Sequence, residues 1–177
     1  DSMLELGSLS YPGSRQYPKT LERARYWFTR AADSGNAGAQ YQVAVMASQG
    51  AGGPKDEATA ALYYKKSLQT WKKEADDGDS KAALWAALVY ERKLVPDSSP
   101  EKSVPYLLQA AESGNLTAQG LLAFKYRDGL GVPQDAAKAV EWFEKAASRK
   151  DLGAVMELGI MFRDGKYLPP DREKAFH

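Results

Sequence analysis

Residues 118–139 read AQGLLAFKYRDGLGVPQDAAKA, and the segment that begins 36 residues later, at residue 154, follows the same pattern. The offset pairs residues of the same kind in the two segments: Ala118 with Ala154, Leu122 with Leu158, Tyr126 with Phe162, Gly129 with Gly165, Pro133 with Pro169 and Asp135 with Asp171. Matches at one constant offset of this length indicate copies of a single structural unit that stack along the chain.

The pattern continues toward the N-terminus, and it predicts one repeat domain over residues 1–177. We place its five repeats at residues 3–38, 39–81, 82–117, 118–153 and 154–177, the last of them incomplete. The second repeat is 43 residues long because it carries seven additional residues around Ser67 to Glu74. The chain starts at Asp1 and stops inside the pattern, so we expect it to be a piece of a longer protein.

Each repeat has the sequence features of two helices. In the first, Ala118, Leu122 and Tyr126 recur at helical spacing, and a turn containing Gly129 and Gly131 follows. The second opens at a residue whose side chain can cap a helix N-terminus, in the five repeats Thr20, Asp56, Ser99, Asp135 and Asp171. Its apolar residues also recur at helical spacing, which predicts an all-α fold of helix pairs.

The apolar face of one helix pair must be buried against the next pair, because two helices alone leave it in water. Pairs of alanines let neighbouring helices approach closely, and one large ring in each second helix is predicted to fill the core: Trp27, Tyr63, Tyr106 and Trp142. We therefore expect the stability of the chain to come from the interfaces between consecutive repeats.

Residues 118–147 resemble the Sel-1-like repeat, a relative of the tetratricopeptide repeat, with Ala123 where that pattern carries glycine. Leu158 and Gly159 restore the glycine in the following repeat. The resemblance extends over nearly the whole chain, and it implies a right-handed α-solenoid. It also implies a scaffold that holds protein partners, often in bacterial envelope, secretion or signalling systems, with a periplasmic or envelope location favoured over a cytoplasmic one.

Two places depart from the pattern. The seven additional residues amount to almost two helical turns, so they keep the apolar face in phase; Trp71 then either packs on a neighbouring helix or projects as a partner contact. In the third repeat Lys93 stands where other repeats have the turn glycine, and Pro105 falls inside the second helix. Since proline removes a backbone hydrogen bond, we expect this helix to start late or to bend.

The composition offers little for catalysis or metal binding. The chain has no cysteine, and its only histidine is His177, so we predict no catalytic residues, no metal site and no cofactor. Residues 50–53 are glycine-rich, but no Gly-Lys-Ser/Thr follows, and we interpret them as a turn between helices. Residues 76–79 lack the ligand alternation of a calcium loop and are interpreted as a helix end.

The charge pattern also limits the partners. With 24 basic and 23 acidic residues the formal net charge is +1, which predicts no nucleic-acid partner. No segment is apolar over 18 residues, so we expect no membrane insertion within this sequence, and no small-molecule substrate is evident. A protein or peptide is the predicted partner.

By position, the resemblance to tetratricopeptide solenoids places the first helix of each pair on the concave face. The residues that would line it, called here the first-helix face, are Tyr41, Val45, Leu84, Leu88, Glu91, Phe124, Arg127, Met156, Ile160 and Arg163. Exposed apolar stripes rimmed by charge are typical of protein-binding surfaces. The alternative is that these apolar side chains are buried between successive first helices.

Three functions fit these features. The first is a non-catalytic scaffold or adaptor that binds a protein on the first-helix face. The second is an immunity protein that blocks a secreted toxin enzyme. The third is a scaffold subunit of the endoplasmic reticulum, for which a glycan on the Asn115-Leu-Thr117 sequon would be evidence.

Overall fold

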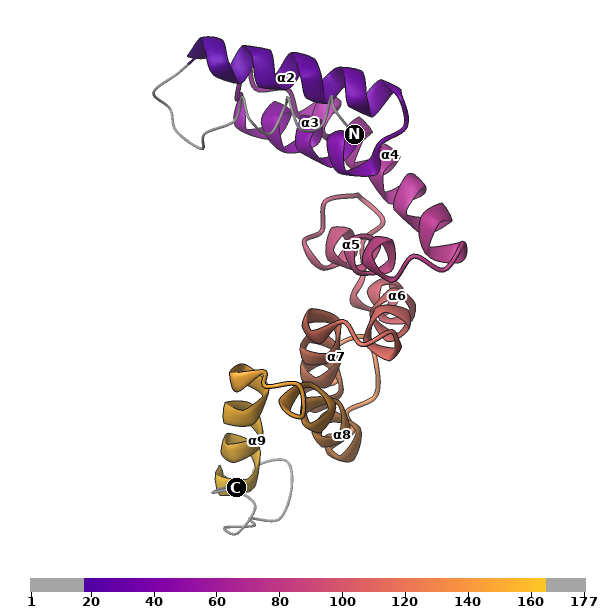
Figure 1. Cartoon of the computed structure of the whole chain (residues 1–177), viewed down its shortest axis with the longest axis vertical. Helices are drawn as coiled ribbons and strands as arrows, with labels where there is room; N and C mark the ends of the chain where they lie inside the picture. The colour runs from indigo at the N-terminus through magenta and orange to yellow at the C-terminus, as the bar shows by residue number, and fades with distance from the viewer. Residues whose placement is uncertain (1–17, 165–177) are drawn as a thin grey trace. The chain divides into compact units, whose positions relative to one another are not determined.

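The computed structural model describes residues 18–164, and all regular secondary structure in this range is α-helical. Eight helices follow one another along it (Figure 1): α2 (Pro18–Asp33), α3 (Ala37–Gln49), α4 (Glu57–Asp76), α5 (Ser80–Glu91), α6 (Pro100–Glu112), α7 (Leu116–Asp128), α8 (Ala136–Ala147) and α9 (Leu152–Asp164). The predicted all-α class is confirmed. The parts of the predicted repeats in 3–17 and 165–177, with the cap at Asp171, lie outside the described residues.

The chain divides into two compact units. Among the described residues, the first unit holds α2, α3, α4 and the short segment Leu94–Pro96, and the second holds α5 to α9. Within each unit every helix packs against the next one in sequence: α2 on α3 and α3 on α4 in the first, then α5 on α6, α6 on α7, α7 on α8 and α8 on α9 in the second. This is the sequential packing that a helical repeat protein requires.

Aspartate side chains cap the N-termini of the second helices α4 and α8. Asp56 accepts a hydrogen bond from the N–H of Thr59 at 2.9 Å, and Asp135 accepts one from the N–H of Lys138 at 3.0 Å, as predicted. Ser99 is the N-cap residue of α6, but its hydroxyl is hydrogen-bonded to Glu101 and does not cap the backbone. The prediction for Thr20 is wrong, because α2 already begins at Pro18.

The turns between first and second helices use left-handed backbone. Gly50 and Gly129 follow α3 and α7 with φ of 68° and 72°. Lys93, which follows α5 and replaces the glycine, keeps the same conformation with φ of 53°. The turn geometry is therefore set by the repeat, even where the residue favours it poorly. The glycine-rich residues 50–53 lie in such a turn, as predicted.

Close packing also requires glycine in two of these turns. A Cβ atom at Gly52 would lie 2.3 Å from the carbonyl oxygen of Leu21, at the start of α2. A Cβ atom at Gly131 would lie 2.5 Å from the carbonyl carbon of Pro100, at the start of α6. In both compact units the turn after a first helix thus rests directly on the preceding second helix.

The core uses a different ring position from the one predicted. The buried residues lie one place later along each second helix, at Phe28, Tyr64, Leu107 and Phe143, with alanines around them. Trp142 is buried as well, whereas Trp27, Tyr63 and Tyr106 are only half-buried. The alanines and the later position therefore form the buried part of each second helix, and the earlier ring is half-buried except at Trp142.

The additional residues of the second repeat and Pro105 of the third repeat both lie inside continuous helices, α4 and α6. Helix α6 begins at Pro100, directly after the predicted N-cap position Ser99, and continues through Pro105. The expectation of a late start is therefore wrong. Trp71 on the extended α4 is only 5% exposed, which excludes the alternative that it projects as a partner contact. The extra turns of α4 instead let Trp71 pack inside the first compact unit.

Candidate functional site

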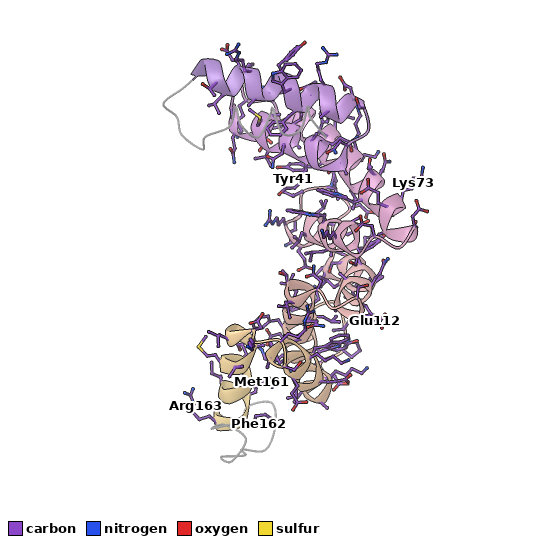
Figure 2. All side chains as sticks on the ribbon, in the orientation of Figure 1. Tyr41, Lys73, Glu112, Met161, Phe162 and Arg163 are labelled. Carbon is purple, nitrogen blue, oxygen red and sulfur yellow. The ribbon has the colours of Figure 1, made fainter. Side chains whose placement is uncertain are left out.

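The ten residues of the first-helix face all lie on first helices: Tyr41 and Val45 on α3, Leu84, Leu88 and Glu91 on α5, Phe124 and Arg127 on α7, and Met156, Ile160 and Arg163 on α9. None of them is fully buried, although seven of the ten are apolar or aromatic. Met156 is 62% exposed and Ile160 is also exposed. Figure 2 shows Arg163 projecting outward near the end of α9.

In the first compact unit this face is aromatic. The Tyr41 ring on α3 lies 5.5 Å from the Tyr64 ring in an edge-on arrangement and 5.7 Å from the Trp71 ring. Both partners belong to α4, so the Tyr41 ring packs against this long second helix. Val45, one helical turn later, is half-buried beside it on α3.

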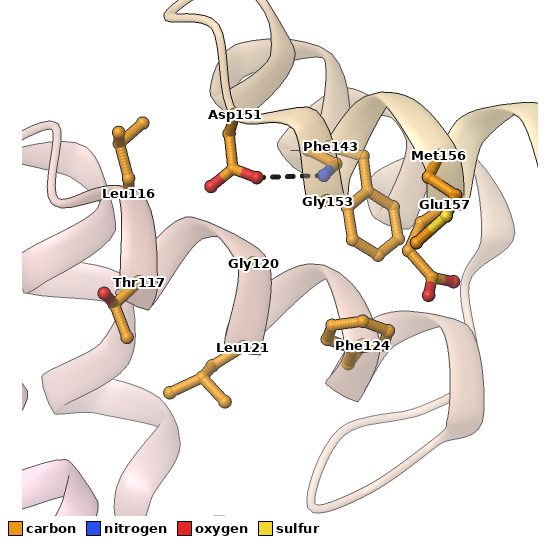
Figure 3. Close-up of a pocket in the computed structure, with 11 residues that line it drawn as sticks. Leu116, Thr117, Gly120, Leu121, Phe124, Phe143, Asp151, Gly153, Met156 and Glu157 are labelled. Carbon is orange, nitrogen blue, oxygen red and sulfur yellow. Dashed lines mark hydrogen bonds between the residues drawn. The ribbon is translucent and has the colours of Figure 1, made fainter.

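In the second compact unit the face is hollowed by a cavity of about 250 Å³ (Figure 3). Two predicted residues, Phe124 and Met156, line it. The other lining residues come from α7, from α8 and from the start of α9: Leu116, Thr117, Gly120, Leu121, Phe143, Asp151, Gly153, Ala154 and Glu157. The Phe124 ring meets the Phe143 ring edge-on at 5.1 Å, which gives the cavity an aromatic wall.

Arg127 contacts two of the residues that line this cavity, Phe124 and Glu157. Its guanidinium lies 4.7 Å from the centre of the Phe124 ring and donates to the Glu157 carboxylate on α9 at 2.7 Å. It also donates to Asp128 at 2.8 Å. These contacts join α7 to α9 and hold the Phe124 ring in place, so Arg127 acts mainly within the protein.

Glu91 is likewise engaged inside the protein. Its carboxylate forms an ion pair of 2.7 Å with Lys125, whose side chain is only 4% exposed, and it accepts a hydrogen bond from the hydroxyl of Ser103. Lys125 also donates to the carbonyl oxygen of Leu130 at 3.3 Å. A buried polar cluster therefore links α5, α6 and α7.

Two members of this cluster, Lys125 and Ser103, were not predicted as site residues, although the repeat pattern marks them. Lys125 is in register with Met46, Val89 and Met161, which are all buried and apolar. Ser103 is in register with the buried alanines Ala24, Ala60 and Ala139. A charge and a hydroxyl at two otherwise apolar positions predict that they have buried partners.

The sequon asparagine has a structural role. Asn115 caps α7, and its side-chain oxygen accepts the N–H of Ala118 at 3.1 Å. Asn36 caps α3 in the same way through the N–H of Ala39 at 2.8 Å. Asp79 caps α5, so the acidic stretch at 76–79 is a helix end, as predicted.

Over residues 18–164, no three histidine, cysteine or carboxylate side chains gather closely enough to hold a metal ion. None of the helices in that range combines the length and the apolar character needed to cross a bilayer. The aromatic and aliphatic side chains of the first-helix face are partly or fully exposed.

Solved structures with a similar fold come from bacteria. The protective antigen c5321 of uropathogenic Escherichia coli, which displays an SLR fold, is 29% identical over 99% of this chain, with a TM-score of 0.70. This chain covers 37% of the length of that antigen. No curated protein sequence matches the chain significantly.

Two more distant structures share the fold alone. A Sel1 repeat protein from Oxalobacter formigenes is 24% identical, with a TM-score of 0.54, over 99% of this chain and 83% of its own. The Pseudomonas aeruginosa protein PA5086 is 18% identical, with a TM-score of 0.55, over 99% of this chain and 61% of its own.

The family model of the Sel1 repeat matches five segments, at residues 1–36, 37–69, 81–115, 117–151 and 153–177. The unmatched stretch 70–80 contains the last part of the extended α4, from Thr70 to Asp76. The chain therefore belongs to the Sel1 repeat family, whose solenoid fold typically serves as a non-catalytic scaffold for protein interactions.

Proposed function

We propose that the chain is a bacterial adaptor that binds a protein or peptide partner on the first-helix face. The observation that carries this proposal is the partial exposure of an apolar stripe in each compact unit. A stripe made only for the core would be buried, as the alanines of the same helices are. Large apolar side chains left in water are typical of a surface that a partner covers.

The exposed part of the stripe is concentrated on α9. Met156 and Ile160 are exposed there, and Met156 lines the cavity. Leu152 and Val155 lie outside the first-helix face on the same helix and are exposed as well. Burying apolar surface yields about 25 cal/mol per Å², so covering two such side chains supplies about 3–6 kcal/mol of binding free energy before the costs of association. A helix or an extended segment of the partner is long enough to cover this stripe.

The bacterial assignment rests on the family and on the origin of the similar structures. The 29% identity to the Escherichia coli antigen extends over 99% of the chain. An envelope, secretion or signalling system is the setting in which we propose the adaptor works.

Selection of peptides from a displayed random library on the purified protein tests the function. We expect peptides that bind the wild type and lose binding to the double variant Met156→Glu, Ile160→Glu. Both residues are exposed, so the added charges face water in the free protein and are desolvated only when a partner covers them.

The matched control is Leu62→Glu on the second helix α4. Leu62 is 51% exposed, close to the exposure of Met156, but it lies on a second helix and outside the first-helix face. This variant should bind the selected peptides as the wild type does. Peptides that bind all variants equally, or the absence of any selected peptide, would contradict the proposed function.

A further inference from the structure

Gly120 leaves a gap in the first-helix face where the other repeats carry a large side chain. Steps of 36 and 43 residues place it in register with Tyr41, Leu84 and Met156. It lies in the middle of α7 and lines the cavity of the second compact unit (Figure 3). A Cβ atom at Gly120 would meet nothing within 4 Å, so the space for a side chain is open.

The second repeat shows which group fits this kind of space. There Tyr41 places its ring edge-on against Tyr64, with centres 5.5 Å apart and planes at 63°. Tyr64 is in register with Phe143, and Phe143 lines the cavity at Gly120. The cavity is thus the equivalent of the Tyr41 site with its own ring removed.

The dimensions and the lining of the cavity suit an aromatic ring. Its volume is about 250 Å³, whereas a cavity of about 150 Å³ is enough for benzene. Leu121, Phe124, Phe143 and Met156 supply apolar, aromatic and thioether surface, which are favourable neighbours for a ring.

The two carboxylates that line the cavity already have partners within the protein. Glu157 accepts from Arg127, and Asp151 accepts the N–H of Ala154 at 3.0 Å. A ring can therefore enter without displacing a hydrogen bond made by either carboxylate.

We propose that the Gly120 cavity binds an aromatic side chain of the partner, inserted at the place where the second repeat carries Tyr41. This inference rests on the proposed function, since the ring belongs to the protein held on the first-helix face. The partner's ring contacts Phe143 and packs beside Met156, and it anchors the bound segment to α7 and α9.

Titration with p-cresol, the side-chain analogue of tyrosine, tests the cavity itself. Followed by NMR, p-cresol should shift the backbone amide of residue 120 and the Met156 methyl in the wild type and in Gly120→Ala, which leaves most of the space open. Gly120→Tyr should lose these shifts at Met156, because its own ring fills the cavity. Equal shifts in wild type and Gly120→Tyr would overturn the proposal.

Melting temperatures show whether a variant loses p-cresol binding only because it is less stably folded. Gly120→Ala and Gly120→Tyr should both melt at or above the wild type, because glycine is unfavourable inside a helix and the added atoms enter open space. If Gly120→Tyr melts well below Gly120→Ala, the cavity does not accept a ring, and the proposal fails.

The library-selected peptides separate this inference from the proposed function. We expect an aromatic residue in the peptides whose binding depends on Met156. The affinity of these peptides for Gly120→Tyr should be at least tenfold lower than for the wild type. Peptides that depend on Met156 but bind Gly120→Tyr as tightly as the wild type would leave the adaptor function standing and overturn the aromatic anchor. A homodimer that Gly120→Tyr dissociates would assign the cavity to a second copy of the chain and also overturn it.

Discussion

The Nζ atom of Lys125 on α7 lies 2.7 Å from Oε1 of Glu91 on α5, and the two side chains are 4% and 29% exposed. The hydroxyl of Ser103 on α6 donates to the same carboxylate. One polar cluster thus connects three consecutive helices of the second compact unit, and its members Lys125 and Ser103 stand at positions where the other repeats are apolar.

Removing the two charges of this pair should have unequal effects. Glu91→Ala leaves the buried ammonium of Lys125 without its counter-charge and should cost about 3–5 kcal/mol of unfolding free energy. Lys125→Met restores the apolar side chain found at Met46 and leaves a carboxylate that can reach water, so it should cost about 1 kcal/mol. Urea unfolding measures both, and equal losses would contradict the interpretation.

The cap of α4 should depend on pH through Asp56. Thr59 donates its hydroxyl to the Asp56 carboxylate at 2.6 Å and its N–H at 2.9 Å, and these bonds, the hydroxyl first, lower the pKa of Asp56. Because the unfolded state then binds the proton more tightly, this stabilisation is present above the unfolded pKa of about 3.9 and is lost as the pH falls through the folded pKa.

An NMR titration of the Asp56 carboxyl carbon checks this prediction. Thr59→Val should raise the pKa of Asp56 toward its ordinary value, since the hydroxyl is the largest cause of the shift. Asp56→Asn keeps a good N-cap without a titrating group and should lose less stability than the wild type between neutral and acid pH. An unchanged pKa in Thr59→Val would refute the assignment.

Replacing the left-handed Lys93 should stabilise the fold. Its φ of 53° follows α5 at the position where α3 and α7 are followed by glycine. Lys93→Gly should gain about 0.5–1 kcal/mol, because the strain of a Cβ in this region exceeds the entropy that glycine loses. Lys93→Ala keeps the Cβ and should gain nothing, so thermal melting of the two variants isolates the backbone effect.

Two glycines of the same repeat should respond to alanine in opposite directions. Gly131 has φ of 78°, and its added Cβ would lie 2.5 Å from the Pro100 backbone, so Gly131→Ala should cost about 2 kcal/mol or more. Gly120→Ala enters open space inside α7 and should gain about 0.5–1 kcal/mol. Chemical denaturation of both variants measures the contrast. A similar loss in both would mean that the close approach at Gly131 is not what requires glycine there.

The sequence by itself determined the helix pairs and their order. Apolar spacing, turn glycines and the caps Asp56 and Asp135 act over a few residues, so a constant offset is enough to locate them. The same local reasoning was wrong for Thr20 and for the start of α6. Helix α2 is already formed at Pro18, before Thr20, and Pro100 at the first helical position starts α6 well despite Pro105.

Only the tertiary structure decided what lies between the helices. Whether Trp71 projected or packed depended on the ring of Tyr41 on another helix. The buried pair of Lys125 and Glu91 joins residues from two repeats, and the cavity at Gly120 needs the walls that α8 and α9 supply. Such features depend on the distance between side chains far apart in the sequence, which packing sets and periodicity does not encode.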